Sequence, residues 1–457
     1  MSRYSQLLRL PARLLLLVAL CLTCLPAHAQ TRQPAAGPSA ATLTAVRTVL
    51  ARELGVESAA LTDTTDLIKD LKLDQAVVYY ALLALYQELR AAPPPAEKTV
   101  VREIAAHIDQ GTAGPARRSV GAARSTSDGE AYVQTVYYLT NRKGTGNPNP
   151  AQAFGGERSE AQQVSFGSAE VSIPRSHKSG QLESVSWLMR QVPDPKLHIF
   201  VMKLNALGEA EFYSRLAGNT FPSNEVLVYI HGYNTSFDDA LRRAGQISFD
   251  FGFKGAPVAF SWPSRASVGS YSADSESVLW SAAYIERFLS TISEKLPGRK
   301  IHVVAHSMGT KGLLYAMRLL AYRNPKNLRL ESVILCAPDF DARLFVEQFA
   351  PLVQPLAQQW AIYSSRKDVA LLTSSTINAA PRLGMPVWPV AGYDIINASE
   401  IEVTPWSLPD THSYYASKQP LIDDMVAMIL GRKPTQRGLK ENKSQAGLFW
   451  TLAGARP

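Results

Sequence analysis

The chain has 457 residues, a length that allows two domains of ~100–200 residues each. Its formal net charge is +8, but most of the excess of basic residues lies at the two ends of the chain, and the remainder is about neutral. A neutral body does not favour a nucleic-acid partner.

Residues 1–29 have the pattern of a cleavable signal peptide. Three arginines precede an apolar run from Leu14 to Leu22, and Ala27-His28-Ala29 then supplies the small residues that mark a cleavage site. The apolar run is too short to span a bilayer comfortably, and no later stretch reaches the ~18 consecutive apolar residues of a membrane span. We therefore expect an exported, soluble protein that is periplasmic or secreted.

Cleavage of this leader would remove two of the three cysteines, Cys21 and Cys24. Cys336 would be the single cysteine of the mature chain, so we expect no internal disulfide, although an exported protein could form one. Stability must then come from the burial of apolar side chains.

Residues 40–110 are expected to form a small helical domain, because apolar residues recur in them at helical spacing. One stretch, Asp70-Leu71-Lys72-Leu73-Asp74-Gln75-Ala76, resembles the acyl carrier proteins. In that family the residue after the second aspartate is the serine that receives phosphopantetheine, whereas Gln75 cannot form the phosphodiester. The resemblance implies a module without carrier chemistry that docks to another protein or serves for packing. An unrelated helical bundle is the alternative.

A linker and a second domain follow. Residues 111–131 are rich in Gly, Ala, Arg and Ser and are expected to form the linker. In residues 132–430, strand-like apolar runs alternate with helical runs, which predicts an α/β fold with a mostly parallel sheet covered by helices on both faces. The expected strands include residues 133–139, 169–173, 226–230, 257–260, 301–305 and 332–337, and the expected helices include residues 237–249 and 278–296.

Residues 431–457 form a basic tail, with six Lys or Arg residues against Glu441 alone. We expect a solvated, partly disordered end of the chain. Contact with a membrane surface or an acidic partner, helped by Leu448-Phe449-Trp450, is the alternative.

The run Val303-Val304-Ala305-His306-Ser307-Met308-Gly309 joins an expected strand to an expected helix. This is the layout of a nucleophile elbow, a sharp turn that exposes one serine hydroxyl above the sheet. The turn requires small residues two positions before and two positions after the serine, and Ala305 and Gly309 meet that requirement. We therefore predict Ser307 as a catalytic nucleophile.

The base and the acid of a catalytic triad follow the serine in hydrolases of this architecture, with the acid first. Of the eight histidines only His412 lies after Ser307, which makes it the candidate base. Asp368 lies in the loop after a later strand, the commoner place for the acid, and is our choice. Asp339, in the loop after the preceding strand, is the alternative acid.

An oxyanion hole needs two backbone N–H donors. Met308, which follows the nucleophile, is expected to supply one, and Tyr233 or Asn234, in the His-Gly loop after an early strand, the other. His231, His306 and Asn141-Arg142 are expected to have structural roles. We find no zinc-type His/Cys cluster and no phosphate-binding glycine loop, so we expect neither a metal nor a cofactor.

Taken together, these motifs resemble a bacterial family of exported α/β-hydrolases of unknown substrate, which are esterase- or lipase-like. The resemblance implies a Ser307–Asp368–His412 triad and a serine hydrolase that cleaves a small acyl ester or thioester. A non-catalytic α/β-hydrolase fold that serves as a binding or scaffold protein of the cell envelope is the alternative. The motifs that carry the resemblance are Val136-Tyr137-Tyr138-Leu139-Thr140-Asn141-Arg142, Ile230-His231-Gly232-Tyr233-Asn234, Phe260-Ser261-Trp262-Pro263-Ser264, Ala305-His306-Ser307-Met308-Gly309, Ala337-Pro338-Asp339 and Thr411-His412-Ser413-Tyr414.

Overall fold

A computed structural model describes most of the chain after residue 37. The described residues are 38–54, 56–71, 99–111, 131–160, 163–184, 192–218, 221–323, 330–403 and 411–452, together with Val78, Ala81, Leu82, Leu85, Leu89 and Leu328. The expected signal peptide, most of the expected linker and Gln75 lie outside the described residues, so the inferences drawn from them stay predictions.

Two helices are described before the linker, α1 (Ala40–Leu54) and α3 (Val101–Gly111). Their apolar side chains are buried together in one cluster, in which Leu50 of α1 and Ile104 of α3 have no exposed surface. Helices with a shared apolar core agree with the helical character expected for residues 40–110. The kinship with acyl carrier proteins and the docking role stay predictions.

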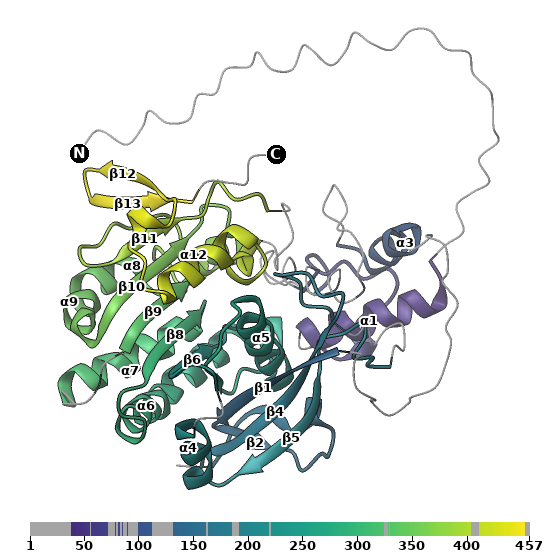
Figure 1. Cartoon of the computed structure of the whole chain (residues 1–457). Coiled ribbons are helices and arrows are strands. Elements are labelled where there is room, and N and C mark those ends of the chain that lie inside the picture. The colour runs from purple at the N-terminus through teal and green to yellow at the C-terminus, as the bar shows by residue number, and fades with distance from the viewer. Residues whose placement is uncertain are drawn as a thin grey trace, which may run out of the picture. The chain divides into compact units, whose positions relative to one another are not determined.

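The rest of the described chain builds one large sheet with helices between its strands (Figure 1). The strands are β1 (Ala131–Thr140), β4 (Ser165–Pro174), β5 (Val201–Leu207), β6 (Glu225–Ile230), β7 (Ala256–Ser261), β8 (Lys300–His306), β9 (Leu330–Cys336), β10 (Ala357–Ser364), β11 (Asp394–Asn397), β12 (Lys440–Ser444) and β13 (Gly447–Thr451). The main helices are α4 (Glu209–Ala217), α5 (Phe237–Asp250), α6 (Tyr271–Lys295), α7 (Gly309–Arg323), α10 (Val369–Ile377) and α12 (Gln419–Ile429). Short helical turns, α8 (Ala342–Leu344) and α9 (Ala350–Val353) among them, and a small hairpin, β2 (Arg142–Gly144) with β3 (Phe154–Arg158), complete it.

The strands of the large sheet lie in the order β12-β13-β11-β10-β9-β8-β6-β7-β1-β4-β5. From β13 to β1 all neighbours pair in parallel, and antiparallel pairs occur only at the two edges, where β12 joins β13 and β4 and β5 follow β1. This confirms the predicted α/β class with a mostly parallel sheet.

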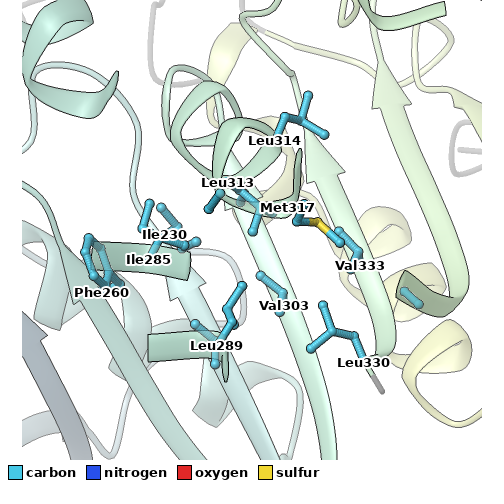
Figure 2. Packing of buried hydrophobic residues seen from close by; sticks show 14 of the residues in the cluster. Ile230, Phe260, Ile285, Leu289, Val303, Leu313, Leu314, Met317, Leu330 and Val333 are labelled. Atoms are coloured by element: carbon cyan, nitrogen blue, oxygen red, sulfur yellow. The ribbon is translucent and has the colours of Figure 1, made fainter. Parts of the chain in front are cut away.

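Successive residues of the central strands face opposite sides of the sheet. On β8, Val303 and Ala305 belong to the cluster that α6 and α7 cover, whereas Val304 belongs to the cluster that α5 and α12 cover. Figure 2 shows Leu313 and Met317 of α7 above Val303 in the first cluster. Strands buried on both faces are expected to have continuous apolar runs instead of an alternating pattern, which is what the sequence has in these segments.

The sheet extends beyond the predicted end of the domain at residue 430, which corrects the expectation of a solvated tail. β13 pairs in parallel with β11, and Trp450 and Leu452 are buried. Arg437, counted as a solvated charge, has a fully buried side chain whose guanidinium lies 3.1 Å from Asp394 and 3.5 Å from Asp424. The sequence alone suggested a solvated segment because its basic residues have almost no acidic residues near them in the sequence. In the fold, Arg437 pairs with two carboxylates that lie before the tail in the sequence.

None of the helices in the described part of the chain is long and apolar enough to cross a membrane.

His177, in the loop after β4, bridges two carboxylates. Its Nδ1 lies 2.9 Å from Glu183 Oε2, and its Nε2 lies 2.8 Å from Oδ1 of Asp250 at the end of α5. Since ionised carboxylates only accept hydrogen bonds, both ring nitrogens carry protons and His177 is an imidazolium. Burial alone would lower its pKa, but the two carboxylates outweigh burial and raise the pKa of His177 to about 9.

We expect the stabilisation by His177 to be complete below the ordinary histidine pKa of about 6.5 and to be lost as pH rises through about 9, because folding raises this pKa. H177Q should lower the free energy of unfolding by roughly 3 kcal/mol at pH 7 and by much less at pH 10. Urea unfolding of both proteins at the two pH values measures the difference. Equal losses at pH 7 and pH 10 would contradict a charged bridge.

Candidate active site

Ser307 forms a left-handed turn between β8 and α7. Its φ is 51°, a value that residues with a side chain rarely adopt and that costs ~1–3 kcal/mol. Its N–H donates to the carbonyl oxygen of Cys336 at 2.9 Å, and its carbonyl oxygen accepts from the N–H of Asp339 at 3.2 Å. A Cβ at Gly309 would lie 2.2 Å from the carbonyl oxygen of His231, so the turn tolerates only glycine there. This turn has the shape that the sequence predicts for a nucleophile elbow.

The loop that follows β6 passes directly beside Ser307. A Cβ added to Gly232 would lie 3.0 Å from the Cβ of Ser307 and 2.8 Å from Nδ1 of His306. A side chain at position 232 would therefore push the loop away from the serine. Glycine allows the backbone N–H groups of this loop to lie close to the place where a substrate carbonyl would be attacked.

Three backbone N–H groups are predicted oxyanion donors, those of Met308, Tyr233 and Asn234. Met308 directly follows Ser307 and is buried. Asn234 has a left-handed φ of 54°, and its N–H makes a long hydrogen bond of 3.4 Å to Oδ2 of Asp274. That bond engages the Asn234 N–H, and the assignment of the second donor to Tyr233 or Asn234 stays a prediction.

His412 and Asp368 form a pair in which the Asp368 side chain is fully buried and the His412 side chain is 13% exposed. Nδ1 of His412 lies 2.9 and 2.8 Å from the two carboxylate oxygens, and Asp368 also caps α10 by accepting from the N–H of Leu371 at 3.0 Å. Burial alone would lower the pKa of His412, but the charge and the hydrogen bonds of Asp368 outweigh burial and raise that pKa. Since Nδ1 faces the carboxylate, Nε2 is the nitrogen that can accept a proton.

The ring of His306 joins the His412 loop to the elbow. Its Nε2 donates to the carbonyl oxygen of His412 at 3.2 Å, and its ring centroid lies 4.7 Å from that of His412 and 4.4 Å from that of Tyr415. Burial, followed by the charge of His412, holds the pKa of His306 well below its usual value, so the ring stays neutral. These contacts bring His412 next to the residue that precedes Ser307, although they lie 106 positions apart in the sequence.

Asp339, the alternative acid, has other partners. Its Oδ2 accepts from the hydroxyl of Tyr271 at 2.8 Å, and its Oδ1 accepts from Oγ of Ser374 at 2.5 Å. No hydrogen bond joins it to His412. The carboxylate that pairs with the candidate base is therefore the first choice from the sequence and not the alternative.

A buried arginine that contacts the loop after β6 has a larger role than the sequence analysis gives it. Arg142 is 1% exposed, and its guanidinium donates to the carbonyl oxygens of Ser264 and Thr235 at 2.8 Å, to that of Gly155 at 3.0 Å and to Oγ of Ser261 at 2.8 Å. Burial lowers its pKa to about 9. The only signal in the sequence is a charged residue at the end of an apolar strand, which indicates a structural role but does not predict these acceptors.

Asp274 and His231 complete the network around Arg142. Asp274 has no exposed surface and accepts from Oγ of Ser264 at 2.6 Å, and its charge opposes the effect of burial on Arg142. His231 Nε2 lies 3.3 Å from the guanidinium, and burial, then the positive charge of Arg142, lower the pKa of His231 to about 3. The network holds both ends of the turn that carries Tyr233 and Asn234, since it reaches His231 before them and the carbonyl of Thr235 after them.

The residues that the structure describes contain no group of three or more His, Cys, Asp or Glu side chains that could hold a metal ion. The charged groups around Ser307 instead form hydrogen bonds suited to proton transfer, above all His412 with Asp368. Acyl transfer to a serine hydroxyl is a chemistry that such a His–Asp pair can support.

Comparisons with known proteins bear on the fold. A family model described as "Alpha/beta hydrolase of unknown function (DUF900)" matches residues 209–426, a span that contains Ser307, Asp368 and His412. Among solved structures, the structure of MenH from S. aureus matches with 13% sequence identity and a TM-score of 0.26, over 46% of this chain and 94% of that chain. A search of curated proteins found no match. The family match and the strand order together give the chain an α/β-hydrolase fold.

We expect R142K to lower the free energy of unfolding by about 3 kcal/mol, because an ammonium cannot reach all four acceptors and buried acceptors without donors cost ~1–3 kcal/mol each. The same change at the exposed Arg343 is the control and should alter stability by less than about 0.5 kcal/mol. Urea unfolding measures both. Equal effects of the two substitutions would show that Arg142 does not hold the network together.

Proposed function

We propose that the protein is a serine hydrolase of the carboxylesterase, lipase or thioesterase type, with Ser307 as nucleophile, His412 as base and Asp368 as the acid that orients it. The observation that carries the proposal is the His412–Asp368 pair, whose histidine contacts His306, the residue before the strained Ser307. The leader pattern of residues 1–29 is the ground for proposing that the enzyme works outside the cytoplasm.

The reaction would proceed through an acyl-enzyme. Oγ of Ser307 attacks the carbonyl carbon of the ester or thioester while Nε2 of His412 takes the hydroxyl proton. The N–H groups of Met308 and of Tyr233 or Asn234 bind the oxyanion of the tetrahedral intermediate. When the intermediate collapses, His412 gives its proton to the leaving alcohol or thiol. Water then attacks the acyl group, His412 takes a proton from it, and Ser307 is released as the hydroxyl.

Asp368 serves this cycle by stabilising the imidazolium that forms at each proton transfer. Its carboxylate binds Nδ1–H, which fixes the tautomer with a free Nε2. The raised pKa of His412 makes it a stronger base than a solvated histidine, and the base is active only in its neutral form.

A scaffold function without catalysis is the alternative. It requires a fold and a binding surface, but it does not require a serine in a strained backbone conformation beside a His–Asp pair. Strain of this kind collects at catalytic positions, which favours the enzyme.

Labelling with a fluorophosphonate tests the nucleophile. We expect the folded protein to gain one adduct on Ser307, and S307A to gain none and to lose roughly 10⁶-fold in ester hydrolysis. Peptide mapping by mass spectrometry locates the adduct, and heat-denatured protein is the control for non-specific reaction. An unlabelled Ser307 in folded protein would favour the scaffold.

The two aspartates are expected to differ sharply in their effect on kcat. D368N should lower kcat by ~10⁴, because the amide cannot hold the reactive tautomer or offset the imidazolium charge. D339N should lower kcat far less, because Asp339 makes no hydrogen bond to His412. Rates with p-nitrophenyl butyrate measure both variants. A larger loss of kcat with D339N than with D368N would contradict the assignment of Asp368 as the acid and favour Asp339.

A further inference from the structure

A polar cluster that the proposed triad does not use lies at the same edge of the sheet as Ser307. Tyr271 begins α6, which follows β7, and Asp339 follows β9, so both lie beyond the carboxyl ends of parallel strands. The Tyr271 hydroxyl joins Asp339 to Ser374 of α10, with oxygen–oxygen distances of 2.8 and 2.9 Å. The ring of Tyr271 also contacts that of Tyr233, with centroids 5.5 Å apart. The cluster therefore borders the proposed oxyanion loop.

Lys311 belongs to this cluster. It follows Ser307 by four positions, about one helical turn, and shares a face of α7 with Tyr315. The ring of Tyr315 lies 6.1 Å from that of Phe340, the residue after Asp339. The face of α7 that carries Lys311 is therefore turned toward the segment that carries Asp339.

Among the described residues, the ammonium of Lys311 has one hydrogen-bond partner. Its Nζ donates to Oγ of Ser275 at 2.6 Å, and none of the carboxylates in the described part of the chain lies within 4.0 Å of it. Burial lowers the pKa of Lys311, and the charge of Asp339 opposes this effect. The folded protein thus keeps a half-buried cation that has donors left for a ligand.

Arg382 adds a second buried cation. Its Nη1 lies 3.5 Å from Oδ1 of Asp339, and its Nε donates to the carbonyl oxygen of Ala380 at 3.2 Å. Two carboxylates act on Lys311: Asp339 is buried and also pairs with Arg382, whereas Glu276 is exposed to solvent. Away from solvent, the two cations therefore face the single carboxylate of Asp339, which suits a monoanion such as a carboxylate better than a dianion.

We propose that Lys311, with Arg382 behind it, binds a free carboxylate of the substrate, so that the preferred substrates of Ser307 are monoesters of dicarboxylic acids. The free carboxylate accepts the unused N–H groups of the ammonium, while the ester carbonyl lies at Ser307. This inference rests on the proposed hydrolase function and names the substrate class of the same site.

Paired substrates test the inference. Mono-p-nitrophenyl esters of succinate, glutarate and adipate are compared with the straight-chain p-nitrophenyl esters of the same carbon number, using the full-length protein. We expect at least one acidic ester to have a kcat/KM at least tenfold above its neutral partner. K311M should lower this ratio by roughly 10- to 100-fold, the effect of losing a hydrogen bond to a charged group.

Three further variants separate charge from structure. K311R keeps the charge and should retain most of the ratio, whereas K311E should lower it further than K311M. K295M removes an exposed lysine at the end of α6 and should leave the ratio at the wild-type value. Thermal melting of each variant shows whether it is folded. A wild-type preference for the neutral ester at every length, or an equal ratio in K311M and K295M, overturns the inference and leaves the hydrolase in place.

A binding measurement decides the inference even if neither ester is hydrolysed. Calorimetry compares the affinity of monomethyl glutarate for S307A with its affinity for the double variant S307A/K311M. We expect the double variant to bind at least tenfold more weakly, and equal affinities overturn the carboxylate site. Failure of the hydrolase itself shows separately, as a lack of fluorophosphonate adduct on Ser307.

Discussion

The left-handed backbone of Ser307 is the constraint on which the carboxyl edge of the sheet depends. A residue with a side chain keeps this φ only where its surroundings fix it, and here the hydrogen bonds of Ser307 with Cys336 at the end of β9 and with Asp339 in the loop after it do so. The turn then excludes side chains from two neighbouring positions, Gly232 and Gly309. The loop after β6 can therefore approach the serine closely. Its backbone N–H groups then lie near the place where a substrate carbonyl would be attacked.

Three histidines around this turn differ in the direction of their pKa shifts because their surroundings differ. His231 lies against the Arg142 guanidinium and His306 is enclosed without a carboxylate, so burial keeps both neutral. Burial would also lower the pKa of His412, but the carboxylate of Asp368 outweighs burial and raises that pKa. A proton that arrives at the site is therefore directed to His412 alone. The neutral rings serve as apolar packing that can still form a hydrogen bond, as His306 does to the His412 loop.

Local patterns in the sequence predicted the central strands closely, because these strands are buried on both faces and have unbroken apolar runs, whereas α6 begins seven residues before the expected helix 278–296. Chain order was enough to select His412, since no other histidine follows Ser307. Arg142 could not be found in this way, because its acceptors lie between 13 and 122 positions away and nothing near it in the sequence marks them. β13 was missed for the same reason. A short strand in a basic segment can be recognised only from its pairing with β11 and from the buried ion pair of Arg437, neither of which the local sequence shows.

The last two strands also have a consequence for how the protein behaves at high concentration. An exposed parallel edge at β13 would offer unpaired backbone groups to the sheet of another molecule. β12 covers that edge, and along it Lys440, Glu441 and Lys443 point their charges into solvent. Any second molecule that tried to extend the sheet would have to desolvate these charges, which is the usual way in which natural sheets prevent edge-to-edge aggregation. The exposed charges of β12 thus oppose pairing of this edge with the sheet of another molecule.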